Sequence, residues 1–519
     1  MKALKLSKRL TWLAALAVMI MPLLAACGTE SPASPTVTAV PAAAAPTDTA
    51  APAAGATDTP AAAAATDTPA AAAMASPTTL NVTAGGTGCA ASAPKVTWYV
   101  GLGAGADPDV IPKEQAWVDN FNKSQTDACL SVQIVHNPES YDTLKAQLAA
   151  GNAPDIVGPV GKAGRASFQG SWADIAPLAQ KAGFDLSKYD PALLDFTKDE
   201  GVLVGIPFAL FPSFIFYNKA LFDEAKLPYP PHKVDEKYNG KDWNMETFQE
   251  LAQKLTVDAN GSDATASDFD AKNVKQYGFF DGPTDARGLA VLFGGGLPYD
   301  PADPKTAKIP DQWRQAWKWY YDSVWKLHMS PNYDAQQSDL LAKGTPFKSG
   351  NVAMAHSHTW FTCCFDMQKL NWDIAVMPTI NGKITAKLHG DTFAILKESK
   401  NQDAAFKVLS KMVVDKELPK IYGGMPAKAE DRPDFFKSLD ERAAPNKVDW
   451  SVADAMLKYP DLPNHESWTP NLIKANDMFT KFRNLMDQTP GLDMDQEITK
   501  LQTQLDAIFK EAPEATPTK

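Results

Sequence analysis

One long apolar run, residues 201–222, is interrupted by two prolines, and the interruption limits what the chain can fold into. The run has the sequence GVLVGIPFALFPSFIFYNKALF. Pro207 and Pro212 fix their own φ angles, remove two backbone N–H donors and push the residues before them into extended geometry. The run therefore cannot be a helix or a central strand throughout. We expect a strand that ends at Pro207, a short extended crossing, a second strand over residues 214–217, and a helix that Asn218 caps. The chain would then leave one sheet and enter another.

Length and charge set the class of protein. With 519 residues, the chain is too long for one hydrophobic core and predicts two or more domains. The formal net charge of −11 argues against a nucleic acid or an anionic membrane surface as partner.

The N-terminus has the pattern of a lipoprotein signal peptide over residues 1–27. Four basic residues lie among the first nine, and an apolar run too short to cross a bilayer follows over residues 10–24. The run ends in Leu-Ala-Ala-Cys, which is similar to a bacterial lipobox and predicts lipidation of Cys27. A secreted form without the lipid is the alternative. We predict no membrane contact other than this lipid.

Residues 28–90 are expected to form a disordered tether. The segment is rich in Ala, Pro and Thr and lacks the aromatic and branched aliphatic residues that offset chain entropy. The simplest role for it is that of a spacer between the membrane and the folded part.

The remaining four cysteines form two pairs. Cys89 and Cys129 each precede a predicted strand, at the same end of neighbouring strands, and an oxidising exterior favours a disulfide between them. Cys363 and Cys364 are adjacent in the sequence, and the pattern leaves open whether they form a vicinal disulfide or remain buried thiols.

The first part of the folded chain alternates strands with helices. The order is strand, helix, strand, helix, strand, over residues 95–100, 112–122, 130–135, 137–150 and 154–157. Such an order predicts a parallel sheet, and ligands bind beyond the C-terminal ends of its strands. The loops at these ends are residues 99–106 and 158–165. The first is glycine-rich but lacks the Lys-Ser/Thr of a P-loop and the spacing of a dinucleotide fingerprint.

A second unit of strands and helices follows the crossing. We expect helices over 245–255, 313–325 and 402–414, and strands over 277–280, 350–356, 372–378 and 390–395. The segment from 378 to 388 would return the chain to the first unit. The aromatic residues of the helix at 313–325 are expected to belong to the core.

Several of these segments resemble the maltose-binding-like group of extracellular solute-binding proteins (family 1) of ABC importers. Tyr-Asn-Lys-Ala-Leu-Phe at 217–222 matches the end of that family's first interdomain crossing, and Gly-Gly-Met-Pro-Ala at 423–427 resembles its G-x-x-P-A turn. The resemblance covers about residues 95–510.

The resemblance implies the two-lobed, type II fold of periplasmic binding proteins, an α/β class in which helices flank the sheet of each lobe. One lobe would comprise residues 91–206 and 385–428, and the other residues 207–384 and 429–512.

By resemblance, a ligand would sit in the cleft between the lobes against aromatic rings. The family places an aromatic residue at Trp360 and another near Trp468. Aromatic faces suit sugars because the C–H face of a pyranose is apolar, while its hydroxyls need polar partners. Core packing is the alternative for either tryptophan. Phe211 is a further candidate for ligand binding. By resemblance it occupies a crossing position where some sugar binders carry a carboxylate, which argues against a specific maltose assignment.

Polar partners of the ligand are expected near the strand ends. Asp391 follows the return crossing and could accept hydrogen bonds from two hydroxyls, or instead cap a loop. The remaining candidates lie on the loops after the first and third strands and on the second lobe; they are Tyr99, Lys162, Arg165, Asp285 and Arg287.

A rival set of residues could bind zinc. His356 and His358 lie close in sequence to Cys363 and Cys364, and His389 would be the fifth member. No HExxH or CxxC motif accompanies them, and His-x-His on a strand shares a face for ordinary reasons. The primary prediction therefore contains no metal and no cofactor.

The leading hypothesis is a monomeric, lipid-anchored substrate-binding protein on the outer face of the cytoplasmic membrane. It would capture a mono- or oligosaccharide and deliver it to the permease of an ABC importer. No nucleophile elbow, metalloprotease helix or P-loop indicates an enzyme. The alternatives are the same fold with a polyol phosphate or a peptide as ligand, a surface zinc-binding protein, and a sensor or adhesin without a transporter.

Overall fold

The computed structural model of the protein describes residues 82–86, 88–90, 92–108, 110–199, 201–282, 284–344 and 346–511. All of them belong to one compact unit. The predicted signal peptide with Cys27, and the predicted tether up to residue 81, lie outside the described residues. Among the described helices, none combines the length and the apolar character that a membrane span requires.

An eleven-stranded mixed sheet runs through the part of the chain that the structure describes. Its strands are hydrogen-bonded in the order β1-β3-β2-β4-β14-β7-β12-β9-β8, while β13 and β15 pair with β7 outside this path. In chain order they are β1 (Val82–Gly85), β2 (Lys95–Val100), β3 (Cys129–Ile134), β4 (Ile156–Val160), β7 (Gly205–Asn218), β8 (Val257–Asp258), β9 (Val274–Asp281), β12 (Val352–His358), β13 (Trp372–Ala375), β14 (Leu388–Ile395) and β15 (Met425–Pro426). Two small two-stranded sheets pair β5 (Lys198–Asp199) with β6 (Val202–Leu203), and β10 (Tyr299–Asp300) with β11 (Asp303–Ala307).

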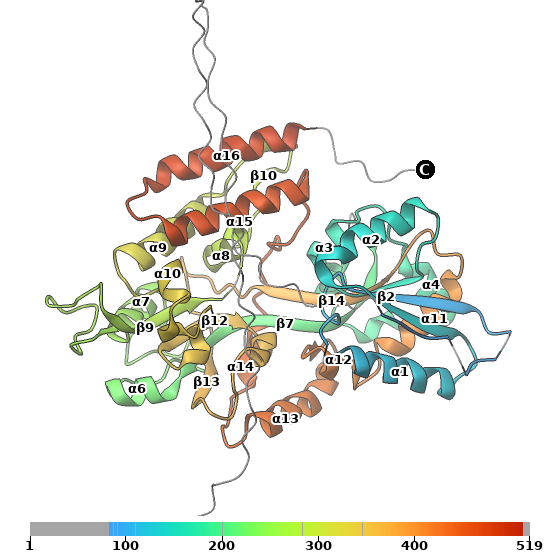
Figure 1. Cartoon of the computed structure of the whole chain (residues 1–519), viewed down its shortest axis with the longest axis horizontal. Helices are drawn as coiled ribbons and strands as arrows, with labels where there is room; N and C mark the ends of the chain where they lie inside the picture. The colour runs from blue at the N-terminus through green and yellow to red at the C-terminus, as the bar shows by residue number, and fades with distance from the viewer. Residues whose placement is uncertain are drawn as a thin grey trace, which may run out of the picture. The chain divides into compact units, whose positions relative to one another are not determined.

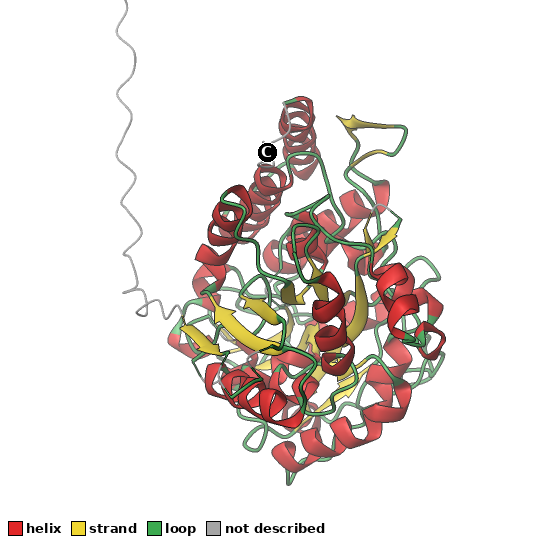
Figure 2. Cartoon of the chain, turned by 90° about the vertical axis from the view of Figure 1, so that its right-hand side faces the viewer, coloured by secondary structure: helices red, strands yellow, loops and turns green. Residues whose placement is uncertain are grey.

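Helices surround these strands, as Figure 2 shows. They are α1 (Ile111–Ser124), α2 (Asn137–Ala149), α3 (Lys162–Ala166), α4 (Ile175–Ala182), α5 (Pro191–Phe196), α6 (Lys219–Ala225), α7 (Met245–Lys254), α8 (Ala286–Ala290), α9 (Asp311–Trp325), α10 (Tyr333–Gln336), α11 (Gln402–Met412), α12 (Leu418–Ile421), α13 (Arg432–Ala443), α14 (Ser451–Met456), α15 (Leu472–Gln488) and α16 (Met494–Lys510). In Figure 1, α2 and α3 lie on one side of β2 and β14, and α1 and α12 lie on the other. This is the layering expected of an α/β fold.

The crossing predicted from the interrupted apolar run is a single strand, β7, with all fourteen residues buried. The prediction of two strands with a gap between them was therefore wrong. The expected passage from one sheet into another is also not seen, because β7 and its partners belong to one sheet. Within that sheet β7 changes its partner, pairing with β14 as far as Pro212 and with β12 from Ser213 onward. Pro212 thus lies where the partner strand changes, and Pro207 lies next to an irregularity in the β14 pairing. A missing N–H is tolerated at both positions because the regular ladder is already interrupted there.

The strands on the β1 side of the crossing form the first part of the sheet. β2 pairs in parallel with β3 and with β4, as the alternating order predicts, and β1 adds an antiparallel edge. Cys89 and Cys129 are joined by a disulfide with their Cα atoms 5.5 Å apart. The bond attaches the segment before β2 to the start of β3.

On the other side of the crossing, β12 pairs in parallel with β9 and antiparallel with β7. Asn218 and Asn244 cap α6 and α7 through their side-chain oxygens, as predicted. Trp313, Trp317 and Tyr320 of α9 are buried, which confirms that the aromatic face of this helix belongs to the core. Helix α9 contacts both α15 and α16, and Figure 1 shows the three helices side by side.

Candidate ligand-binding site

Strand β14 presents two polar side chains on one face of the sheet. His389 and Asp391 are two residues apart, so their side chains point to the same side, and both are half-buried. The strand is held between β4 and β7, where His389 pairs with Phe211 and Asp391 with Ala209. Both polar groups are therefore fixed by a central strand and not by a loop.

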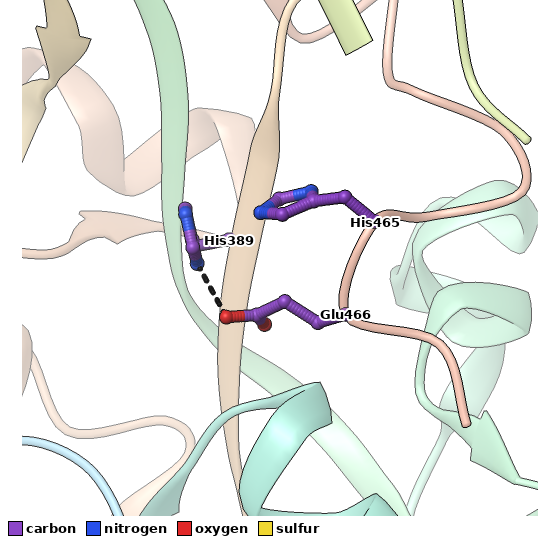
Figure 3. A group of neighbouring side chains, drawn as sticks. All are labelled: His389, His465 and Glu466. Atoms are coloured by element: carbon purple, nitrogen blue, oxygen red, sulfur yellow. Dashed lines mark ion pairs between the residues drawn. The ribbon is translucent and has the colours of Figure 1, made fainter. Parts of the chain in front are cut away.

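The loop between α14 and α15 is attached to the beginning of β14 by Asp461. This side chain is fully buried, and its carboxylate accepts hydrogen bonds from the backbone N–H of Leu388 and from that of His465, both at 2.8 Å. Asn464 adds a hydrogen bond from its amide to the carbonyl of Leu388 at 2.9 Å. As a result Glu466 faces β14, and its Oε1 lies 3.1 Å from Nδ1 of His389 (Figure 3).

Three histidine rings form a row between β12 and this loop. The ring centroid of His389 lies 4.4 Å from that of His358 and 4.8 Å from that of His465, with an edge-to-face arrangement at both contacts. At the far end, Trp360 stacks on His358 at 5.6 Å with an interplanar angle of 16°. We call His358, His389 and His465 the histidine row.

The carboxyl groups beside the row have shifted pKa values. Burial acts to raise the pKa of Glu466, but His389, His465 and Arg287 together outweigh it and hold that pKa well below its usual range. Burial also raises the pKa of Asp391, to about 6, and the negative charge of Glu466 adds to the shift. Burial acts to lower the pKa of His389, yet Glu466 raises it above its ordinary value. Glu466 and His389 thus form an ion pair, and Asp391 stands next to it.

An open groove of about 290 Å³ adjoins this polar cluster. Its lining comes from α3 and the residues after it, from β5, from β10 and the segment before it, and from the loop after α14. The residues are Lys162, Arg165, Ala166, Gln169, Lys198, Asp199, Leu297, Tyr299, Pro463, Ser467 and Trp468. Trp468 and Tyr299 meet edge to face at 6.3 Å. The groove therefore offers aromatic side chains together with several charged and polar ones.

Three of the residues predicted from the sequence, Lys162, Arg165 and Trp468, lie together in this groove. The ammonium group of Lys162 is 3.3 Å from Asp199, whose other oxygen lies 2.8 Å from Nε of Arg165. Arg165 is fully buried. Asp199 thus binds both cations of α3.

Trp360 is absent from the groove lining and lies in a 3₁₀ turn (Thr359–Cys363) after β12. It is half-buried, and the histidine row connects it with the loop that carries Trp468. Arg287 on α8 is buried, with its Nε 3.4 Å from Asp285 and its guanidinium over the ring of Phe479. Its Nη1 has no hydrogen-bond partner among the described residues.

The other two predicted site residues occupy core positions. Tyr99 on β2 is fully buried, and its hydroxyl donates a hydrogen bond to the carbonyl of Ser140 at 2.7 Å. Phe211 is 5% exposed in the middle of β7. Both side chains are therefore surrounded as packing residues are, and Tyr99 has no surface left that a ligand could contact.

His465 and Glu466 were not recognised in the sequence. They lie between the Pro-Asp-Leu-Pro segment and Trp468, both of which were noticed, but the pattern Asn-His-Glu-Ser resembles no motif. The predicted zinc set differs from the observed grouping. Among the described residues, His389 lies with His465 and Glu466, and the side chain of Cys363 is outside the described part of the chain.

Solved structures of bacterial binding proteins share this fold. An ABC substrate-binding protein from Listeria monocytogenes in complex with cycloalternan has a TM-score of 0.59 at 20% identity, over 80% of this chain and 98% of that one. The sugar-binding protein MalE from Xanthomonas citri has a TM-score of 0.60 at 18% identity, over 80% and 97%. The cyclic alpha-maltosyl-1,6-maltose binding protein from Arthrobacter globiformis has a TM-score of 0.58 at 18% identity, over 80% and 99%. The fold of this chain is thus that of the two-lobed periplasmic binding proteins.

Sequence comparison identifies the family. A search of curated proteins gives no match. The profile of the bacterial extracellular solute-binding proteins, however, matches residues 116–422, which is more than half of the chain. The chain therefore belongs to the family of bacterial extracellular solute-binding proteins.

Proposed function

We propose that this protein is the substrate-binding component of an ABC importer and captures a mono- or oligosaccharide between its two lobes. The observation that carries the proposal is the groove of about 290 Å³ in which Trp468 and Tyr299 face the charged residues of α3 and β5. Residues 91–206 with 385–428 would form one lobe, and residues 207–384 with 429–512 the other. The change of partner along β7 at Pro212 and Ser213 supports a lobe boundary within that strand.

The groove draws its lining from both proposed lobes. Lys162 and Asp199 belong to the first, and Tyr299 and Trp468 to the second. A ligand that touches both sides stabilises the closed arrangement by its additional contacts there, which is the hinge mechanism of binding proteins. A permease would then recognise the closed pair of lobes.

The chemistry of the lining suits a sugar. The rings of Trp468 and Tyr299 can pack on the apolar face of a pyranose, and Gln169, Ser467 and Asp199 offer donors and acceptors for hydroxyls. A phosphorylated ligand fits less well, because Asp199 already binds both Lys162 and Arg165.

The test is calorimetric titration of the purified full-length protein with maltose, maltotriose, glucose and tagatose. We expect at least one saccharide to bind with one site per chain. Trp468→Leu should weaken that binding by tenfold or more, since an aromatic contact of this kind contributes on the order of 1–2 kcal/mol.

Trp117→Leu is the matched control. Trp117 is a half-buried tryptophan of α1 that stacks on Phe121 outside the groove. This variant should bind the saccharide as the unchanged protein does. Absence of binding across the panel, or an equal loss in both variants, would contradict a sugar site at Trp468.

The lipid anchor at Cys27 is part of the proposal and has a separate test. In the unchanged chain we expect the protein in the membrane fraction with a mass shift of a diacylglyceryl group on Cys27. Cys27→Ser should release it to the soluble fraction. Equal membrane retention of both forms would argue against lipidation at this residue.

A further inference from the structure

The groups of His389, His465 and Glu466 that can bind a metal lie close together. One such atom from each residue lies within 4.8 Å of the other two. Figure 3 shows the three side chains pointing toward one another, His389 from β14 and the other two from the loop after α14. We call these three residues the histidine–glutamate cluster. We propose that the cluster binds a divalent transition-metal ion such as Zn²⁺, and that His358, which lies next to His389 but outside the 4.8 Å grouping, turns toward the ion as its fourth ligand.

The spacing is within reach of a zinc site. Zinc takes four ligands in a tetrahedron, with bonds of about 2.0–2.2 Å to His nitrogen and carboxylate oxygen, so its ligand atoms are about 3.4 Å apart. The Nδ1 of His389 and the Oε1 of Glu466 already lie 3.1 Å apart. No separation within the cluster exceeds 4.8 Å, so none needs to shorten by more than about 1.4 Å, which a rotation of the Glu466 side chain and a small shift of the loop that carries it can supply.

His358 is an independent sign that a ligand belongs here. Its side chain is 3% exposed, and neither ring nitrogen has a hydrogen-bond partner among the described residues. Burying two unpaired polar atoms is unfavourable, and such atoms are rare in folded proteins. The His358 ring lies 4.4 Å from the His389 ring. Coordination of a metal would satisfy one of its nitrogens and supply the fourth ligand.

The buried carboxylate of Asp461 orients the ring of His465, as carboxylates commonly orient metal-binding histidines. The Nδ1 of His465 lies 2.8 Å from Oδ2 of Asp461, which leaves Nε2 as the free nitrogen. Metal-binding histidines commonly use their second nitrogen in this way, since the carboxylate fixes the ring and makes the other nitrogen a better ligand. Asp461 also accepts the backbone N–H of His465, so the ring cannot turn easily.

The charges around the cluster favour a cation. No lysine or arginine of the described chain forms an ion pair with Asp391, Asp461 or Glu466. The buried arginines nearby form their ion pairs with other carboxylates, Arg287 with Asp285, and Arg483 with Asp281 and Asp487. The buried Lys387 adds a positive charge that acts on His358 and His389, and Asp281 offsets part of it. Among the described residues, the ion-pair partner of Glu466 is His389 and that of Asp461 is His465, so a divalent ion would add positive charge beside these carboxylates.

This site is separate from the sugar proposal. His465 and Glu466 lie outside residues 116–422, the part matched by the family profile. The ion would connect β14 to the loop whose next residues, Ser467 and Trp468, line the groove.

The test is calorimetric titration of ZnCl₂ into the purified full-length protein after treatment with a chelator. We expect one Zn²⁺ per chain and a rise of the melting temperature on binding. Co²⁺ as a substitute should give the absorption spectrum of a tetrahedral complex with nitrogen and oxygen ligands. His465→Gln and Glu466→Gln should each weaken Zn²⁺ binding by tenfold or more and remove the rise in melting temperature.

His136→Gln is the matched control, because His136 is a half-buried histidine that precedes α2 and lies outside the cluster. It should bind Zn²⁺ as the unchanged protein does. Circular dichroism shows whether each variant folds, and Glu466→Gln keeps the shape and an acceptor for His389. No stoichiometric Zn²⁺ binding, or binding that neither cluster variant weakens, would overturn the proposal.

Discussion

Glu114 lies on α1 with none of its side chain exposed, and its Oε1 accepts a hydrogen bond from the hydroxyl of Tyr422 at 2.7 Å. Its Oε2 has no hydrogen-bond partner among the described residues. Burial raises the pKa of Glu114 to about 8, although the bond from Tyr422 acts against the shift. This carboxyl group is therefore protonated at neutral pH in the folded protein.

The raised pKa predicts how stability depends on pH. The folded state holds the proton of Glu114 more tightly than the unfolded state, so its contribution is fully present below about pH 4.5 and is lost as pH rises through about 8. The unfolding free energy of the unchanged protein should therefore fall between pH 5 and pH 9. In the Glu114→Gln variant this fall should be smaller by on the order of 1–3 kcal/mol. Urea unfolding at both pH values measures this. Glu246→Gln, an exposed residue of α7, is the control, and an equal pH dependence of both variants would contradict the prediction.

Some residues of the groove and of the polar cluster beside it were recognisable in the sequence, and others were not, for a physical reason. Lys162 and Trp468 were found because each lies near a recognisable segment, a strand end and a Pro-x-x-Pro segment. The proximity of His389 and Glu466 is set by Asp461, which attaches the loop to β14 through a tertiary contact. No local pattern encodes that contact. The sequence likewise could not show that Tyr99 is fully buried.

At the scale of elements, local signals were most reliable where capping and periodicity agree. The helix at α7 was predicted within a residue of its bounds, because Asn244 caps it and its apolar residues recur on one face. The continuity of β7 was missed because prolines usually end a strand. They are accommodated here at an irregularity and at a change of partner, and the positions of partner strands are not visible in a single sequence.

The disulfide between Cys89 and Cys129 is expected to stabilise the folded protein at the β1–β3 edge. It closes a loop with a sequence separation of 40 residues, and loop entropy predicts a contribution of about 4 kcal/mol. Replacing both cysteines by serine should lower the unfolding free energy by up to that amount. Reduction of the disulfide should destabilise the unchanged protein similarly and should leave the double variant unaffected. A double variant as stable as the oxidised protein would contradict this account.

Gly278 on β9 predicts tight packing of this strand against α7. A Cβ atom at Gly278 would overlap the carbonyl group of Ala252. Gly278→Ala should therefore destabilise the protein by about 1–3 kcal/mol in urea unfolding. Lys275→Ala, an exposed position of the same strand, should change stability little. Equal stabilities of the two variants would show that the contact relaxes without cost.

For the whole molecule, the proposed capture of a ligand requires that the ligand contact both lobes at once. The groove combines α3 and β5 of the first proposed lobe with Tyr299 and Trp468 of the second. The two-lobed fold was predictable, because the interrupted run at 201–222 and the later return segment indicate crossings between lobes; the bounds of the lobes stay a prediction. The lining of the groove was only partly predictable, since it depends on how loops distant in sequence meet.

Capture between the lobes can be followed by hydrogen–deuterium exchange of the full-length protein, with and without the saccharide that binds most tightly. We expect slower exchange on binding in two places together, residues 162–169 with 198–199 and residues 297–299 with 463–468. Protection confined to one of these places, or found only away from the groove, would contradict capture between the lobes.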